Sequence, residues 1–99
     1  MEINKIQTDE KITFALKGKL DTISSPQLQE QLIAAFDGAK QVELDFDGVI
    51  YVSSAGLRTL LLGEKAANAK GGAMTLVNVP SDVKDVLKIT GFDKILKIN

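Results

Sequence analysis

Two apolar periodicities alternate along this chain, and their order restricts the fold more than any other feature. Residues 12–16 and 42–46 carry apolar side chains at every second position, the pattern of a strand with one buried face. Residues 26–36 and 55–70 repeat them at helical spacing, which is typical of helices that pack on a sheet. Strands joined by helical crossovers run parallel, so the sequence predicts an α/β domain.

Turn residues between the periodic segments set the expected boundaries. In chain order we expect a β-hairpin (2–17), a helix (26–36), a strand (41–46), a helix (55–70), a short central strand (73–79), a helix after Pro80 and an apolar edge segment (92–98). Ser25 is expected to cap the first helix, with Pro26 at its first position. The apolar stretch from Gly48 to Val52 is expected to be buried.

Acidic residues occupy the alternate positions of the third strand. Glu43 and Asp45 indicate that one face of the sheet is turned to solvent. We therefore expect a single two-layer domain over residues 1–99, with a mixed sheet of four to five strands and helices packed mainly on one face. No repeat, linker or low-complexity segment divides the chain.

Cysteine and histidine are both absent from the 99 residues. Their absence excludes disulfides, thiolate or imidazole metal ligands, cysteine nucleophiles and a Ser-His-Asp triad. Any catalysis would depend on carboxylates or lysines alone. We therefore expect a protein that is not an enzyme and that has no catalytic residues, no metal and no cofactor.

The charges are balanced, with 12 basic and 13 acidic residues spread along the chain. Without a basic block we expect no binding to nucleic acid. No apolar run approaches the roughly 20 residues that a membrane-spanning helix needs, so direct membrane insertion is not expected. The first residues lack the order of a signal peptide, which favours a cytoplasmic protein.

Two serines stand at the junction between the third strand and the second helix. Ser53 and Ser54 lie where an N-cap is expected, just before the apolar residues Gly56 and Leu57. A hydroxyl at such a junction lies beside unpaired backbone N–H groups and the positive end of a helix. The junction is therefore a plausible place for a phosphate group.

Parallel strands bring a second loop to the same edge of the sheet. The loop after the second strand contains Asp21 and Thr22, which we expect to lie close to Ser53 and Ser54. Turn formation and helix capping explain each of these residues taken alone. Two serines exceed what one cap requires, so one hydroxyl is expected to be left free.

Several segments together resemble the STAS domain, the fold of bacterial anti-sigma factor antagonists and of sulfate-transporter tails. They are L-K-G-K-L-D (16–21), V-E-L-D-F (42–46), Y-V-S-S-A-G-L-R (51–58), residues 72–79 and L-K-I-T-G-F (87–92). The resemblance extends over essentially the whole chain without insertions. The S-S-A-G-L-R segment after an acidic strand is its most specific part.

The resemblance implies a phosphorylation switch at Ser54. In the family, the serine two residues before the helix glycine is phosphorylated by a partner that is both anti-sigma factor and serine kinase, which breaks their complex. A metal-dependent serine phosphatase restores binding. This chain has Ser53 where the family often has aspartate, so Ser53 is the alternative acceptor, and it has Ala55 where serine is common.

The same resemblance assigns a partner-binding surface to the two loops. Its expected residues are Asp21, Thr22, Ser53, Ser54, Ala55, Gly56, Leu57 and Arg58. Asp21 matches the acidic residue of the family's G-x-L-D loop. Arg58 either reaches back to a phosphate on Ser54 or is an ordinary exposed helix arginine. An alternative function is that of a STAS subunit that stabilises an ABC-type lipid transporter without being phosphorylated.

Overall fold

The strands lie side by side in the order in which they occur in the chain. The computed structural model contains β1 (Glu2–Gln7), β2 (Lys11–Leu20), α1 (Ser25–Phe36), β3 (Gln41–Val52), α2 (Ser54–Ala69), β4 (Ala73–Val77), α3 (Ser81–Ile89), the 3₁₀ helix η1 (Phe92–Lys94) and β5 (Lys97–Ile98). β1 is antiparallel to β2, and every other neighbouring pair is parallel. The predicted mixed sheet and element order are confirmed.

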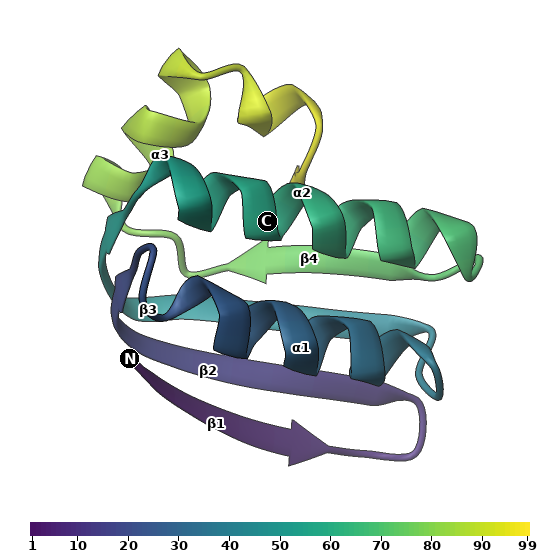
Figure 1. Cartoon of the computed structure of the whole chain (residues 1–99). Helices are drawn as coiled ribbons and strands as arrows, with labels where there is room; N and C mark the ends of the chain where they lie inside the picture. Colours follow the sequence, from purple (N-terminus) through teal and green to yellow (C-terminus); the bar gives the residue numbers. More distant parts are fainter.

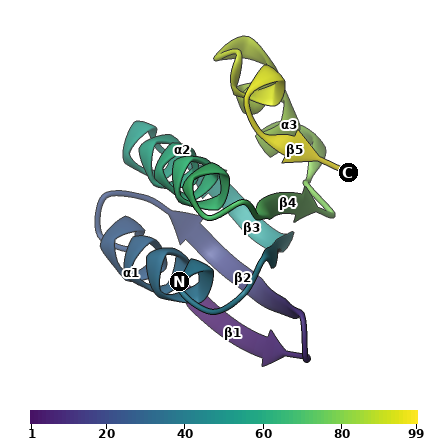
Figure 2. The same cartoon turned by 90° about the vertical axis from the view of Figure 1, so that its right-hand side faces the viewer.

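The helices and the sheet form two layers. α1 and α2 lie against one face of the sheet, and α3 lies at its β4–β5 end (Figures 1 and 2). A single cluster of 22 buried apolar residues fills the space between the layers, and Val83 and Leu87 of α3 belong to it. The opposite face carries the half-buried side chains of Glu43 and Asp45, as their alternation predicts.

The central strand β3 is longer than the sequence indicates. It has 12 residues against 10 in β2, and the register between the two strands shifts at two places. Such β-bulges add a residue to one strand and change the direction of the side chains that follow. The prediction that residues 48–52 are all buried is therefore wrong, because Ile50 is 70% and Tyr51 52% exposed.

The first helix begins one residue earlier than predicted. The N–H of Ser25 donates to the carbonyl oxygen of Asp21 at 2.8 Å, so the chain already turns there and Ser24 becomes the N-cap residue. Neither serine makes a side-chain cap, and the buried hydroxyl of Ser25 has no hydrogen-bond partner within the protein. The prediction of Ser25 as a cap is wrong, whereas Pro26 lies in the first turn as expected.

The C-terminal part of the sheet is also shorter than predicted. β4 ends at Val77, since Asn78 adopts a left-handed conformation with φ 54°. β4 is the fourth strand of five, so β3 and not the 73–79 segment is central. The expected last edge strand is present as β5, paired with β4.

Candidate functional site

The carboxyl ends of β2 and β3 meet in register at one edge of the sheet. Leu20 pairs with Val52, and the N–H of Ser53 donates to the carbonyl oxygen of Leu20 at 2.9 Å. This bond joins the start of α2 to the end of β2, directly before Asp21. The predicted proximity of the two loops is confirmed.

The two serines of the β3–α2 junction differ in their surroundings. Ser53 is the N-cap of α2, and its half-buried Oγ accepts a hydrogen bond from the N–H of Gly56 at 3.2 Å. Ser54 is the first residue of the helix, is exposed, and its hydroxyl makes no hydrogen bond within the protein. One serine therefore caps the helix, and the other presents a free hydroxyl to solvent.

Gly56 allows the helix to start close against β2. A Cβ at this position would lie 2.6 Å from the carbonyl oxygen of Leu20 and 2.9 Å from the Cγ of the same residue. Such distances are shorter than van der Waals contact, so any larger residue would push α2 away from the strand. Gly56 fixes the position of Ser54 relative to the neighbouring loop, and both it and Leu57 are buried.

Asp21 organises the loop between β2 and α1. Its Oδ1 accepts hydrogen bonds from the backbone N–H groups of Ile23 and Ser24, both at 3.1 Å. The backbone bond from Ser24 is the main cause that lowers the pKa of the Asp21 carboxyl, and the Ser24 hydroxyl, Ile23 and Lys19 act in the same direction against partial desolvation. The loop is held by a charged carboxylate, with Thr22 exposed beside it.

Arg58 is the first cationic side chain of α2 and makes no ion pair. Arg58 is exposed and lies four positions after Ser54, on the same side of α2. It takes part in neither of the ion pairs of the structure, which join Lys11 to Glu43 and Lys70 to Asp37. Arg58 is free to contact an anion at the start of the helix.

Three exposed apolar side chains that the sequence analysis missed lie in the same two segments. Ile50 and Tyr51 belong to the bulged end of β3, and Ile23, 90% exposed, belongs to the loop after β2. An isoleucine between Thr22 and Ser24 was an available signal in the sequence. The exposure of Ile50 and Tyr51 was not, because periodicity alone cannot place a bulge.

Two further properties concern the whole chain. No three His, Cys, Asp or Glu side chains gather in a geometry that could hold a metal ion. None of the helices combines the length and the apolar character that crossing a membrane requires.

Comparison with known proteins identifies the family. The family model described as "Mlab, STAS domain" matches residues 3–97. The chain belongs to the STAS-domain family of anti-sigma factor antagonists. It is 31% identical over 99 residues to BtrV of Bordetella bronchiseptica, provisionally named an anti-sigma factor antagonist; the match covers 99% of this chain and 85% of that protein. It is 26% identical over 93 residues to the anti-sigma-B factor antagonist of Bacillus subtilis, and this match covers 94% of this chain and 85% of that protein.

Solved structures show the same STAS fold at lower sequence identity. A protein from Thermotoga maritima, provisionally named an anti-sigma factor antagonist, superposes with a TM-score of 0.89 at 21% identity, covering 97% of this chain and 84% of that one. SpoIIAA in its unphosphorylated form superposes with a TM-score of 0.78 at 17% identity, covering 99% of this chain and 87% of that one. SpoIIAA has also been solved in its phosphorylated form. The STAS architecture predicted from the sequence is confirmed.

Proposed function

We propose that this protein is a non-enzymatic anti-sigma factor antagonist that is switched off by phosphorylation of Ser54. The observation that carries the proposal is the free, exposed Ser54 hydroxyl at the start of α2, beside a Ser53 that is already used as the cap. Two relatives are named as antagonists of anti-sigma factors, which supports the same role here. The phosphorylated form of SpoIIAA supports a phosphorylation switch on this fold.

The start of α2 suits a phosphate within the protein itself. A phosphoserine carries about −1.5 to −2 charges at neutral pH. The first turn of α2 contains no acidic residue, so no carboxylate already compensates the helix dipole there. Arg58 lies one helical turn further on and can reach the phosphate. Phosphorylation should therefore leave the fold intact.

The same charge is unfavourable once a partner covers this edge. The proposed contact surface comprises Asp21, Thr22, Ser53, Ser54, Ala55, Gly56, Leu57 and Arg58. We add the exposed Ile23, Ile50 and Tyr51, which a partner would bury together with Ser54. A phosphate beside the charged Asp21 carboxylate would have to lose its water there, and a penalty of about 1.4 kcal/mol already weakens binding tenfold.

The partners follow from this switch. An anti-sigma factor serine kinase would bind the unmodified surface and phosphorylate Ser54, and a metal-dependent serine phosphatase would restore it. Neither reaction requires a catalytic group on this chain, and all three proteins would meet in the cytoplasm.

Phosphorylation can be mapped with a matched control serine. Incubation with the cognate kinase and ATP, followed by mass spectrometry, should modify Ser54 but not Ser81, which is the exposed first residue of α3. Ser54→Ala should abolish modification, whereas Ser53→Ala should retain it at the cost of about 1 kcal/mol of stability from the lost cap. Phosphate found only on Ser53 would overturn the assignment.

Binding tests the switch independently. Ser54→Asp should weaken binding to the anti-sigma factor kinase, which binds the unmodified surface, at least about tenfold, equivalent to 1.4 kcal/mol. Ser81→Asp should leave this affinity unchanged. Equal affinity of the Ser54→Asp protein and the unmodified protein would sink the switch.

The alternative is a STAS subunit that binds an ABC-type lipid transporter through the same surface without phosphorylation. Affinity purification from the source cell separates the two functions. Recovery of a transport ATPase, with no kinase and no phosphate on Ser54, would favour the alternative.

A further inference from the structure

A second surface feature lies between α3, η1 and β5, outside the site at Ser54. There the surface forms an open cavity of about 720 Å³, a volume within the range of small-molecule sites. Its lining residues are Thr75, Lys84, Lys88, Asp93, Leu96, Lys97, Ile98 and Asn99. None of them belongs to the proposed partner surface.

The cavity has a charge opposite to that of the whole chain. Three of its residues are lysines and one, Asp93, is acidic, whereas the chain as a whole has a net charge of −1. None of the three lysines takes part in either ion pair of the structure. Lys97 lies on the other side of β5, so Lys84 and Lys88 outnumber the one acidic lining residue, Asp93, and the cavity keeps a net positive charge.

The helical spacing of α3 places two of the lysines on the same side of the helix. Lys84 and Lys88 are four residues apart and each follows a buried residue, Val83 or Leu87, that anchors the helix in the core. Like charges at this spacing on one helix repel each other. A bound anion would relieve that repulsion, because both lysines are among the residues that line the same cavity.

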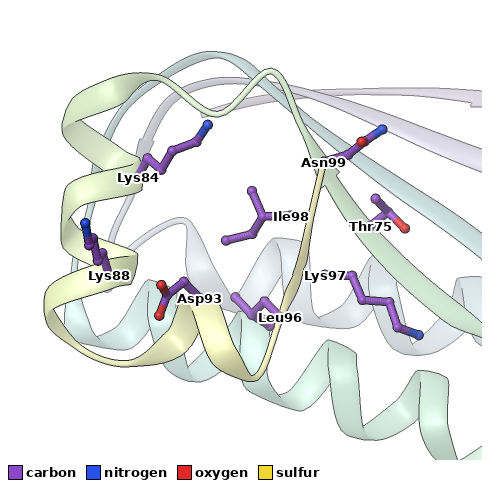
Figure 3. A pocket seen from close by; sticks show the side chains of 8 residues that line it. All are labelled: Thr75, Lys84, Lys88, Asp93, Leu96, Lys97, Ile98 and Asn99. Carbon is purple, nitrogen blue, oxygen red and sulfur yellow. The ribbon is translucent and has the colours of Figure 1, made fainter.

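The remaining lining groups add hydrogen bonds and a small apolar surface. Ile98 lies in the middle of the hollow, with Lys84 and Lys88 on the α3 side and Asp93 and Leu96 at its η1 end (Figure 3). Asn99 borders the end near Lys84. The Asn99 amide can donate a hydrogen bond to the ligand, the Asp93 carboxylate can accept one from a ligand hydroxyl, and Ile98 and Leu96 can contact a short carbon skeleton.

We propose that this cavity binds a small organic anion with at least two negative charges, carried by phosphate or carboxylate groups. The anionic groups contact the ammonium groups of Lys84 and Lys88, and the carbon skeleton lies on Ile98. Lys97, which lies on the other side of β5 in Figure 3, contributes longer-range attraction. The site is independent of Ser54 and of the partner that binds there.

Titration of the ¹⁵N-labelled full chain by NMR tests this site. The probes are pyrophosphate and citrate, which separate phosphate from carboxylate recognition. We expect saturable shifts of the amides of Lys84, Lys88, Ile98 and Asn99 with at least one probe, and weaker binding as salt increases. Saturation by pyrophosphate alone would support phosphate ligands, and saturation by citrate alone would support polycarboxylates.

Matched variants distinguish a site from general attraction. The double variant Lys84→Gln/Lys88→Gln should weaken binding about tenfold or more. Lys94→Gln removes one charge from η1 but none from the cavity lining, and it should change the affinity less than twofold. Since all three lysines are exposed, the variants should remain folded, and thermal unfolding verifies this.

Three outcomes would overturn the proposal. The first is the absence of saturable shifts with both probes. The second is an equal loss of affinity in the Lys94→Gln and double variants. The third is a set of shifts confined to Ser54 and Arg58, which would place the anion at the start of α2.

Discussion

Two Ser-Ser pairs occupy equivalent places in this fold and have opposite surroundings. Ser24–Ser25 lie at the start of α1 after β2, and Ser53–Ser54 lie at the start of α2 after β3. Ser24 and Ser25 are buried, at 7% and 4% exposure, whereas Ser53 is half-buried and Ser54 exposed. The same dipeptide thus fills the interior at one junction and offers a hydroxyl to solvent at the other.

The difference originates in the length of the connections. After β3, only Ser53 separates Val52 from α2, and the helix starts against β2. After β2, the longer loop folds back, so that the Ser24 hydroxyl donates to the carbonyl oxygen of Lys19 at 2.7 Å. The longer loop between β2 and α1 folds over its own serines and buries them. The short connection between β3 and α2 leaves the first residue of the helix, Ser54, exposed to solvent.

The largest change in stability is expected from placing a larger side chain where α2 packs closely against β2. Gly56→Val should lower the free energy of unfolding by about 3 kcal/mol, the upper part of the range for overpacking, because its side chain meets Leu20. Denaturant unfolding measures the loss. Gly38→Ala is the control, since a Cβ there has no neighbour within 4 Å, and it should stay within about 0.5 kcal/mol. Equal losses in both variants would contradict the close approach.

The next effect compares one serine from each pair. Ser24→Ala should cost about 2 kcal/mol, because the Lys19 carbonyl and the Asp21 N–H both lose the partly buried hydrogen bond to the Ser24 hydroxyl. Ser54→Ala should change stability by less than about 0.5 kcal/mol, since its hydroxyl makes no bond within the protein. Thermal or denaturant unfolding of the two variants provides the test. A Ser54→Ala loss as large as that of Ser24→Ala would mean that Ser54 has a structural role.

Substitution of Ser25, the second serine of the buried pair, is expected to change stability less and in the opposite direction. The Ser25 hydroxyl is buried without a hydrogen-bond partner, so Ser25→Ala removes an unsatisfied polar group. We expect this variant to be unchanged or up to about 1 kcal/mol more stable. The same unfolding experiment decides it. A clear destabilisation would show that the hydroxyl is bonded in solution, for instance to water.

Part of the fold and of the site can be predicted from the sequence. Period-2 and helical patterns place the strands, the helices and their order, because a buried face must be apolar. The proximity of Asp21 and Ser53 follows from parallel strands alone. Which of the two serine pairs is buried does not follow, because it depends on loop length and on where the helix begins. The exposure of Ile50 and Tyr51 depends on a bulge in β3, which leaves no periodic signal.

The smallest effect concerns Asp21, the acidic residue that holds the buried serine pair in place. Its pKa is lowered from the ordinary value of 3.8, chiefly by the backbone N–H of Ser24. A carboxyl whose pKa is lower in the folded state stabilises the fold above its unfolded pKa, and this contribution is lost as pH falls through the folded value.

Acid unfolding of the wild type and of Asp21→Asn should therefore differ in slope. Below pH 3.8 the wild type should lose stability more steeply, and the difference between the two proteins isolates Asp21 from the other carboxyls. Above that range the two curves should run parallel, because the wild-type carboxylate is then fully charged in both states. Parallel curves over the whole acid range would mean that the carboxylate does not hold the Ser24 turn. The buried and exposed serine pairs would then owe their difference to loop length alone.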